Sequence, residues 1–298
     1  LTRNTETAMY SAKDNGRDNY QYFTPSMNAS MLERLQLEQR LRSAVLHQAF
    51  CLHYQPIVSM ETGQITSVEA LIRWNDPEYG WVSPEKFIPI AENSGLIEPI
   101  GEWVLEQALK DLSQWHAKGI ELDMAINVSS RQCINVSGVR FDSLLTDAIK
   151  RHAIAPERLH IEITESMLLD DSPHCLEVLN SIRQLGVTIH MDDFGTGFSS
   201  LSYLRKFPIS VIKIDKSFVD NALVNEADAS LVRAIVMMGK SLDLQLVAEG
   251  IETRAQWILL KSMGCDFGQG YLLSRPLPAK SLTPILAQGE TFIRQLLA

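Results

Sequence analysis

Cysteine is scarce in this sequence, and the four cysteines lie too far apart to act together. Cys51, Cys133, Cys175 and Cys265 form no C-x-x-C pair, which argues against a zinc site and against a disulfide framework. Free thiols are typical of a reducing cytoplasm, where we expect this chain to reside.

Long apolar runs are missing too. No stretch of about 18 apolar residues occurs, so we expect no membrane span. We also find no signal peptide. The sequence begins at Leu1 rather than Met, which indicates a fragment of a longer protein and leaves an upstream membrane anchor or sensor open.

Positive charge is in short supply. The chain has 27 Lys and Arg against 36 Asp and Glu, a net charge of −9. Nucleic-acid binders need a basic surface, so we expect no DNA or RNA partner. A small phosphate-bearing ligand remains compatible with this charge, because metal ions and one or two local cations can hold it. No G-x-G-x-x-G or P-loop follows any predicted strand, which argues against a doubly wound open sheet.

What the sequence does contain divides into three parts. Residues 1–24 are too few to bury a core and resemble the tail of a preceding domain. Residues 25–50 carry apolar side chains at helical spacing and predict a connector helix. Residues 51–298 alternate strands with helices and predict the main domain.

Eight strands are predicted in the main domain, at 52–59, 65–75, 124–128, 159–164, 187–192, 211–214, 246–248 and 267–273. A hairpin turn at 60–63 makes the first pair antiparallel. Helical segments connect the later strands. This rhythm over roughly 245 residues predicts an α/β fold, a TIM-like (β/α)8 barrel whose first strand is antiparallel.

Polar residues gather where seven of these strands end. They are Glu69 and Arg73, Asn127, Glu162 and Glu165, Asp192 and Asp193, Lys213 and Asp215, Glu249 and Glu252, and Gln269. Asp, Asn and Glu are depleted in strands, so chance does not account for this placement. In a barrel the carboxyl ends of the strands meet on one face, where active sites are built.

So many carboxylates near one face need cations. Oxygen ligands without a Cys or His cluster select Mg²⁺ or Mn²⁺, and we expect two ions per site. Two such ions suit in-line displacement at phosphorus by an activated water. Lys213 and Arg73 add fixed positive charge.

The motifs in order resemble those of EAL domains, the cyclic-di-GMP phosphodiesterases of bacteria. The matching segments are Glu69-Ala70-Leu71, Asn127-Val128-Ser129, Glu162-Ile163-Thr164-Glu165, Asp192-Asp193-Phe194-Gly195, Lys213-Ile214-Asp215, Glu249-Gly250-Ile251-Glu252 and Gln269-Gly270-Tyr271. The resemblance covers about residues 33–290. Residues 1–24 resemble the last helix and strand of a GGDEF domain, whose signature is absent, so we expect no cyclase activity.

The resemblance implies roles for these residues. Glu69, Asn127, Glu162 and Asp192 would bind a first metal, Asp192 would bridge to a second, and Asp193 and Glu249 would complete that second site. Lys213 would hold the attacking water, and Glu249 is alternatively its base. The residues predicted to be catalytic are thus Glu69, Asp193, Lys213 and Glu249.

The remaining implied roles concern substrate and loop. Arg73 would bind a phosphate, and Gln55 would contact a guanine. Substrate contact or support of the site would fall to Asp215, Glu252 and Gln269. Glu165 would brace the loop 193–200. A purely structural role stays open for three of these residues. Asp215 would then pair with a neighbouring lysine, Glu252 would begin a helix, and Gln269 would mark a bend.

The expected activity is metal-dependent hydrolysis of cyclic-di-GMP to linear pGpG. One alternative is a catalytically silent module that binds cyclic-di-GMP, although the complete acid set disfavours it. Another is an unrelated two-metal barrel hydrolase. The resemblance also suggests a homodimer and an upstream GGDEF or sensor domain.

Overall fold

The computed structural model describes residues 22, 24–134, 140–165, 167, 173–196 and 201–288. The expected remnant of a preceding domain, 1–24, therefore lies almost wholly outside the described residues. The chain forms two compact units, one of Leu1–Phe50 with Trp74–Leu96 and the other of Cys51–Arg73 with Ile97–Ala298.

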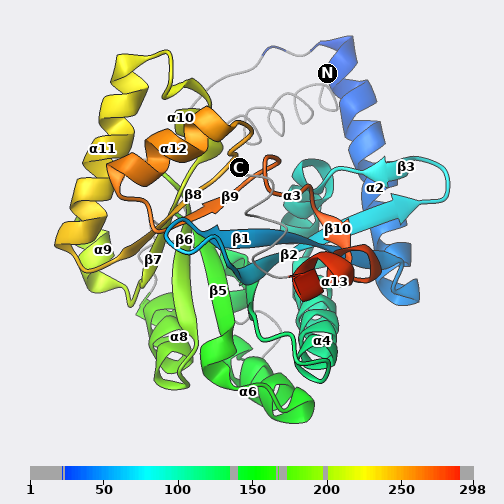
Figure 1. Cartoon of the computed structure of the whole chain (residues 1–298). Coiled ribbons are helices and arrows are strands. Elements are labelled where there is room, and N and C mark those ends of the chain that lie inside the picture. Colours follow the sequence, from blue (N-terminus) through cyan, green and yellow to red (C-terminus); the bar gives the residue numbers. More distant parts are fainter. Residues whose placement is uncertain are drawn as a thin grey trace. The chain divides into compact units, whose positions relative to one another are not determined.

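The larger unit is built on a closed barrel of eight strands (Figure 1). These strands are β1 (Phe50–Ser59), β2 (Ile65–Asp76), β4 (Asp123–Asn127), β5 (Leu159–Thr164), β6 (Thr188–Phe194), β7 (Val211–Ile214), β8 (Gln245–Ala248) and β9 (Phe267–Gln269). The order is β1-β9-β8-β7-β6-β5-β4-β2, and β1 pairs with β2 to close it. Neighbours from β2 through β9 run parallel, and β1 runs antiparallel to β9. The predicted barrel with an antiparallel first strand is confirmed.

Helices connect the strands and cover their outer faces. They are α4 (Ile97–His116), α5 (Ser130–Ile134), α6 (Phe141–His152), the 3₁₀ turn η1 (Pro156–Arg158), α8 (Pro173–Gln184), α9 (Leu201–Lys206), α10 (Lys216–Asn221), α11 (Glu226–Ser241), α12 (Arg254–Met263) and α13 (Ala279–Gln288). In α4, the apolar stripe Val104, Leu105, Ala108, Leu109 and Leu112 is buried, as an amphipathic helix over a sheet requires. Within the described part of the chain, no helix has the length and apolarity to cross a membrane.

The smaller unit contains α2 (Pro25–His47), the end of β2, β3 (Gly80–Val82) and α3 (Pro84–Ser94). The predicted connector helix corresponds to α2, which ends at His47 because Gln48 adopts a left-handed conformation (φ 52°). Trp74 packs edge-on against Phe87 with ring centroids 5.6 Å apart. Arg40 forms an ion pair with the buried carboxylate of Asp76 at 2.6 Å.

One predicted strand is too long. We expected a strand over 267–273, but β9 ends at Gln269. A Cβ at Gly270 would lie 2.2 Å from the backbone of Ile251, so only glycine allows this close approach, and the chain turns there. A short strand, β10 (Leu277–Pro278), follows and pairs antiparallel with β1.

Candidate active site

Lys213 lies at the centre of the polar end of the barrel. It comes from β7, and its side chain is 1% exposed. The distances from its Nζ are 2.7 Å to Glu249 Oε1, 2.9 Å to Glu162 Oε2, 3.2 Å to Asp192 Oδ1 and 3.5 Å to Glu69 Oε2. Glu69 lies within β2, Glu162 and Asp192 lie near the ends of β5 and β6, and Glu249 directly follows β8. The barrel thus brings together residues far apart in sequence.

One ammonium among four carboxylates leaves an excess of negative charge. Burial disfavours the charged form of Lys213, but the surrounding carboxylates outweigh it and raise the pKa of this ammonium well above its usual value. Burial, together with the charges of Glu69 and Asp192, raises the pKa of Glu162 well above its usual range. Burial and the charge of Asp192 raise the pKa of Glu249 to about 8. A bound cation would reverse these shifts, because it favours the ionised carboxylates.

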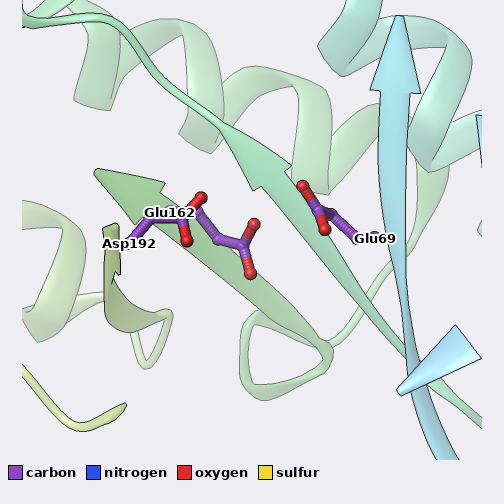
Figure 2. Close-up of side chains that lie close together, drawn as sticks. All are labelled: Glu69, Glu162 and Asp192. Atoms are coloured by element: carbon purple, nitrogen blue, oxygen red, sulfur yellow. The ribbon is translucent and has the colours of Figure 1, made fainter. Parts of the chain in front are cut away.

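The donor set fits divalent metal ions. Oxygens of Glu69, Glu162 and Asp192 lie within 4.8 Å of one another, and so do those of Asp192, Asp193 and Glu249. Figure 2 shows the side chains of Glu69, Glu162 and Asp192 lying close together. Asp192 belongs to both groups. All five donors are carboxylates, which hard cations such as Mg²⁺ and Mn²⁺ prefer.

Asn127 stands beside this cluster at the end of β4. Its Nδ2 donates a hydrogen bond to Glu69 Oε1 at 2.7 Å. The amide oxygen of Asn127 takes no part in this hydrogen bond. A hard cation would bind that oxygen, while the amide nitrogen holds Glu69.

Asp193 leaves the strand in an unusual backbone conformation. Its φ is +54°, and the register of β6 against β7 shifts between Met191 and Phe194. Burial, the charge of Asp192 and then that of Asp215 raise the pKa of Asp193 to about 6. Because of this left-handed turn, the side chain of Asp193 takes a different direction from that of Asp192, which points into the barrel.

The loop after Asp193 contacts Glu165. The backbone N–H of Gly195, where φ is +99°, donates a hydrogen bond to Glu165 Oε2 at 3.0 Å. A bracing role for Glu165 needs such a contact, and that role stays a prediction. Residues 197–200 of the predicted loop lie outside the described residues.

A chain of amides supports Glu69 from the other side. The Nε2 of Gln269 donates to Glu69 Oε2 at 2.6 Å and to Gln55 Oε1 at 3.1 Å, and Gln55 in turn donates to the carbonyl of Ser274 at 3.1 Å. Both glutamines are buried. The barrel therefore places these predicted substrate contacts against the carboxylate cluster.

The other predicted substrate residues lie around this core. Arg73 is half-buried and donates to the carbonyl of Ile72 at 2.9 Å. Asp215 caps α10 by accepting a hydrogen bond from the backbone of Ser217 at 3.0 Å. Glu252 precedes α12 and forms an ion pair with Lys216 at 2.6 Å.

A pocket of about 240 Å³ lies over the cluster. Its lining includes Gln55, Glu69, Asp192, Glu249, Glu252 and Gln269 from the prediction, and Leu71, Lys216, Gly250, Gly270 and Tyr271 besides. The ring centroid of Tyr271 lies 5.7 Å from Lys216 Nζ and 4.3 Å from Arg275 Cζ. The motif Gln269-Gly270-Tyr271 contains this ring, but its contacts with Lys216 and Arg275 were not predictable, because no local spacing links the three residues.

Comparisons with known proteins agree with this arrangement. Residues 38–276 match the family model of the EAL domain. The chain is 43% identical over 288 residues to the bifunctional diguanylate cyclase/cyclic di-GMP phosphodiesterase MucR of Pseudomonas aeruginosa, covering 96% of this chain and 42% of MucR. It is 39% identical over 279 residues to the cyclic di-GMP phosphodiesterase PdeR of Escherichia coli, covering 94% of this chain and 42% of PdeR. The chain thus spans about two fifths of the length of these curated relatives.

Solved structures are similar as well. The cGMP-bound form of the EAL enzyme Bd1971 superposes with a TM-score of 0.81 at 38% identity, covering 87% of this chain and 71% of that chain. The c-di-GMP complex of the PaMucR phosphodiesterase gives a TM-score of 0.78 at 41% identity, covering 83% of this chain and 99% of that chain. With a family match over most of its length and this structural agreement, the chain belongs to the EAL domain family.

Proposed function

We propose that this chain is a metal-dependent phosphodiesterase that hydrolyses cyclic-di-GMP to linear pGpG. The observation that carries the proposal is the buried Lys213 among the four carboxylates of Glu69, Glu162, Asp192 and Glu249. Such a cluster suits an anionic substrate only when cations bind with it. The relatives named as cyclic di-GMP phosphodiesterases support the choice of substrate.

Two divalent ions, Mg²⁺ or Mn²⁺, would be held by the carboxylate groups. Glu69, Asn127, Glu162 and Asp192 would hold the first, and Asp192, Asp193 and Glu249 the second. When bound, such ions supply an activated water at neutral pH and neutralise charge on the phosphoryl oxygens.

The chain's own residues would position the reactants. Lys213 carries a fixed positive charge where the attacking water and a phosphoryl oxygen would lie, a form of electrostatic stabilisation that needs no reorganisation. Glu249, the carboxylate nearest to Lys213, would alternatively act as the base that takes the water's proton. Arg73 would pair with a phosphate, and Gln55 would contact a guanine edge.

The substrate pocket would draw on further residues. Gln269 donates hydrogen bonds to Gln55 and Glu69, and Glu252 lines the pocket with its ion-pair partner Lys216. Asp215, which caps α10 at Ser217, would contact substrate or support the site. Glu165 would hold the loop that carries Asp193. The residues that line the pocket would therefore determine specificity, and the carboxylate cluster would carry out the chemistry.

The proposed domain organisation follows the sequence. Residues 1–24 would end a GGDEF-like domain, 25–50 would form the connector, and 51–298 would form the phosphodiesterase barrel. We propose a homodimer in the cytoplasm, regulated by an upstream GGDEF or sensor domain.

A turnover experiment tests this proposal. The protein is incubated with cyclic-di-GMP in Mg²⁺, in Mn²⁺ and in EDTA, and pGpG is followed by chromatography. We expect pGpG to accumulate with either metal and not in EDTA. Tight binding of cyclic-di-GMP without metal-dependent turnover would refute the enzyme hypothesis and support the catalytically silent receptor module instead.

A further inference from the structure

A pair of histidines, the buried His190 and the partly exposed His160, lies beside the carboxylate cluster. His190 on β6 and His160 on β5 stack with ring centroids 4.4 Å apart and planes inclined by 38°. His190 is two residues before Asp192, so both side chains point into the barrel. In the register of the sheet, His190 is the partner of Glu162.

Two polar atoms without hydrogen-bond partners face each other here. Glu162 Oε2 accepts a hydrogen bond from Lys213, but Oε1 is buried and has no partner among the described residues. The same holds for Nδ1 of His190, whose side chain is 6% exposed. The two atoms are 3.7 Å apart. A hydrogen bond needs a distance shorter by about half an ångström, which a small shift of either side chain would provide.

The surroundings of His190 favour one tautomer. In a neutral imidazole only one of the two ring nitrogens carries a proton. Thr188 Oγ1 lies 3.4 Å from Nε2 and can donate to that nitrogen. The proton then sits on Nδ1, the nitrogen that faces Glu162.

We propose that His190 is a positioning residue, which donates from Nδ1 to Glu162 Oε1 and leaves Oε2 as the oxygen that Glu162 presents to a metal ion. The inference rests on the proposed function insofar as Glu162 is a metal ligand. Groups that orient a ligand from behind strongly affect affinity, because a freely turning carboxylate must be ordered when the metal binds.

Three substitutions at position 190 separate the hydrogen bond from the volume of the ring. His190→Asn keeps an N–H donor where Nδ1 stood, His190→Gln moves the donor to the Nε2 position, and His190→Leu removes it. His116→Leu is the matched control, since this imidazole bonds the carbonyl of Leu122 at 2.9 Å, away from the cluster. Mn²⁺ affinity is measured by titration calorimetry, and circular dichroism checks that each variant is folded.

We expect His190→Leu and His190→Gln to weaken Mn²⁺ binding by about 10- to 100-fold, the effect typical of such supporting residues. His190→Asn should retain most of the affinity, and His116→Leu should match the wild type. Equal affinities across the three position-190 variants would overturn the proposal. If Leu does not fold, the comparison of Asn with Gln decides.

The tautomer gives an independent readout in metal-free wild-type protein. Nitrogen-15 NMR of labelled histidine should place the His190 proton on Nδ1, and a proton on Nε2 would overturn the proposal. Failure of the proposed function looks different. In that case the wild type binds no Mn²⁺, or Glu162→Gln binds it as the wild type does, whereas the Nδ1 proton is still found.

Discussion

Lys213→Met offers the sharpest test of the charge balance in the site. Lys213 is fully buried, and four carboxylates surround its ammonium. Methionine has a similar length and flexibility but no charge. Removing one partner of a buried ion pair typically costs about 3–5 kcal/mol, because it leaves uncompensated charge behind. We expect a loss of this size in metal-free protein, which corresponds to a fall in Tm of roughly 10 °C.

The pH dependence of this loss has a definite sign. Without the ammonium, the pKa values of Glu249, Asp193 and Glu162 rise further above those of the unfolded chain. A carboxyl group with a raised folded pKa stabilises the fold below its unfolded pKa, and this contribution is lost as the pH rises through the folded value. The deficit of Lys213→Met should therefore grow as the pH rises through about 6, the folded pKa of Asp193 in the wild type, and then through about 8, that of Glu249.

Differential scanning calorimetry in EDTA and in Mg²⁺ is the assay. Bound Mg²⁺ supplies part of the missing charge, so we expect it to raise the Tm of Lys213→Met more than that of the wild type. The exposed Lys261 on α12 provides the control Lys261→Met. Turnover by Lys213→Met should fall by about 100- to 1000-fold. A metal-free Tm equal to that of the control would refute the reasoning.

Three further predictions concern metal and charge. Glu69→Ala should reduce turnover and Mn²⁺ affinity by at least about 100-fold, measured by pGpG chromatography and calorimetry, and near-wild-type values would refute its role as a ligand. Ca²⁺ should fail to support turnover and should inhibit in competition with Mg²⁺, because it prefers more ligands in a looser geometry; full activity in Ca²⁺ would contradict the account. The hydrogen bond from Arg40 lowers the pKa of Asp76, so this pair stabilises the fold above the usual Asp pKa, and the gain is lost as the pH falls through the folded value. The Tm of the wild type should thus exceed that of Arg40→Met at pH 7, with the gap shrinking in acid; a gap that does not depend on pH would count against this pairing.

Local pattern predicted much of the fold. The predicted bounds of strands 159–164 and 211–214 agree with the structure, since the apolar pattern of each segment and its turn residues are local signals. The site was predictable for a related reason. Parallel strands in a closed barrel bring their carboxyl ends together, so polar residues at strand ends identify the face.

The parts that escaped prediction depend on contacts between distant segments. The end of β9 is set by the backbone of Ile251 against Gly270. β3 has three residues, too few for any period to register. No local signal links His190 to Glu162, and only the three-dimensional register places the two side by side.

Anomalous diffraction from crystals grown with Mn²⁺ and cyclic-di-GMP tests the central claim most directly. The account predicts two manganese peaks. One should be bound by Glu69, Asn127, Glu162 and Asp192, and the other by Asp192, Asp193 and Glu249, with a phosphate of the nucleotide against both. Nucleotide bound in the pocket with no manganese at these carboxylates would contradict it.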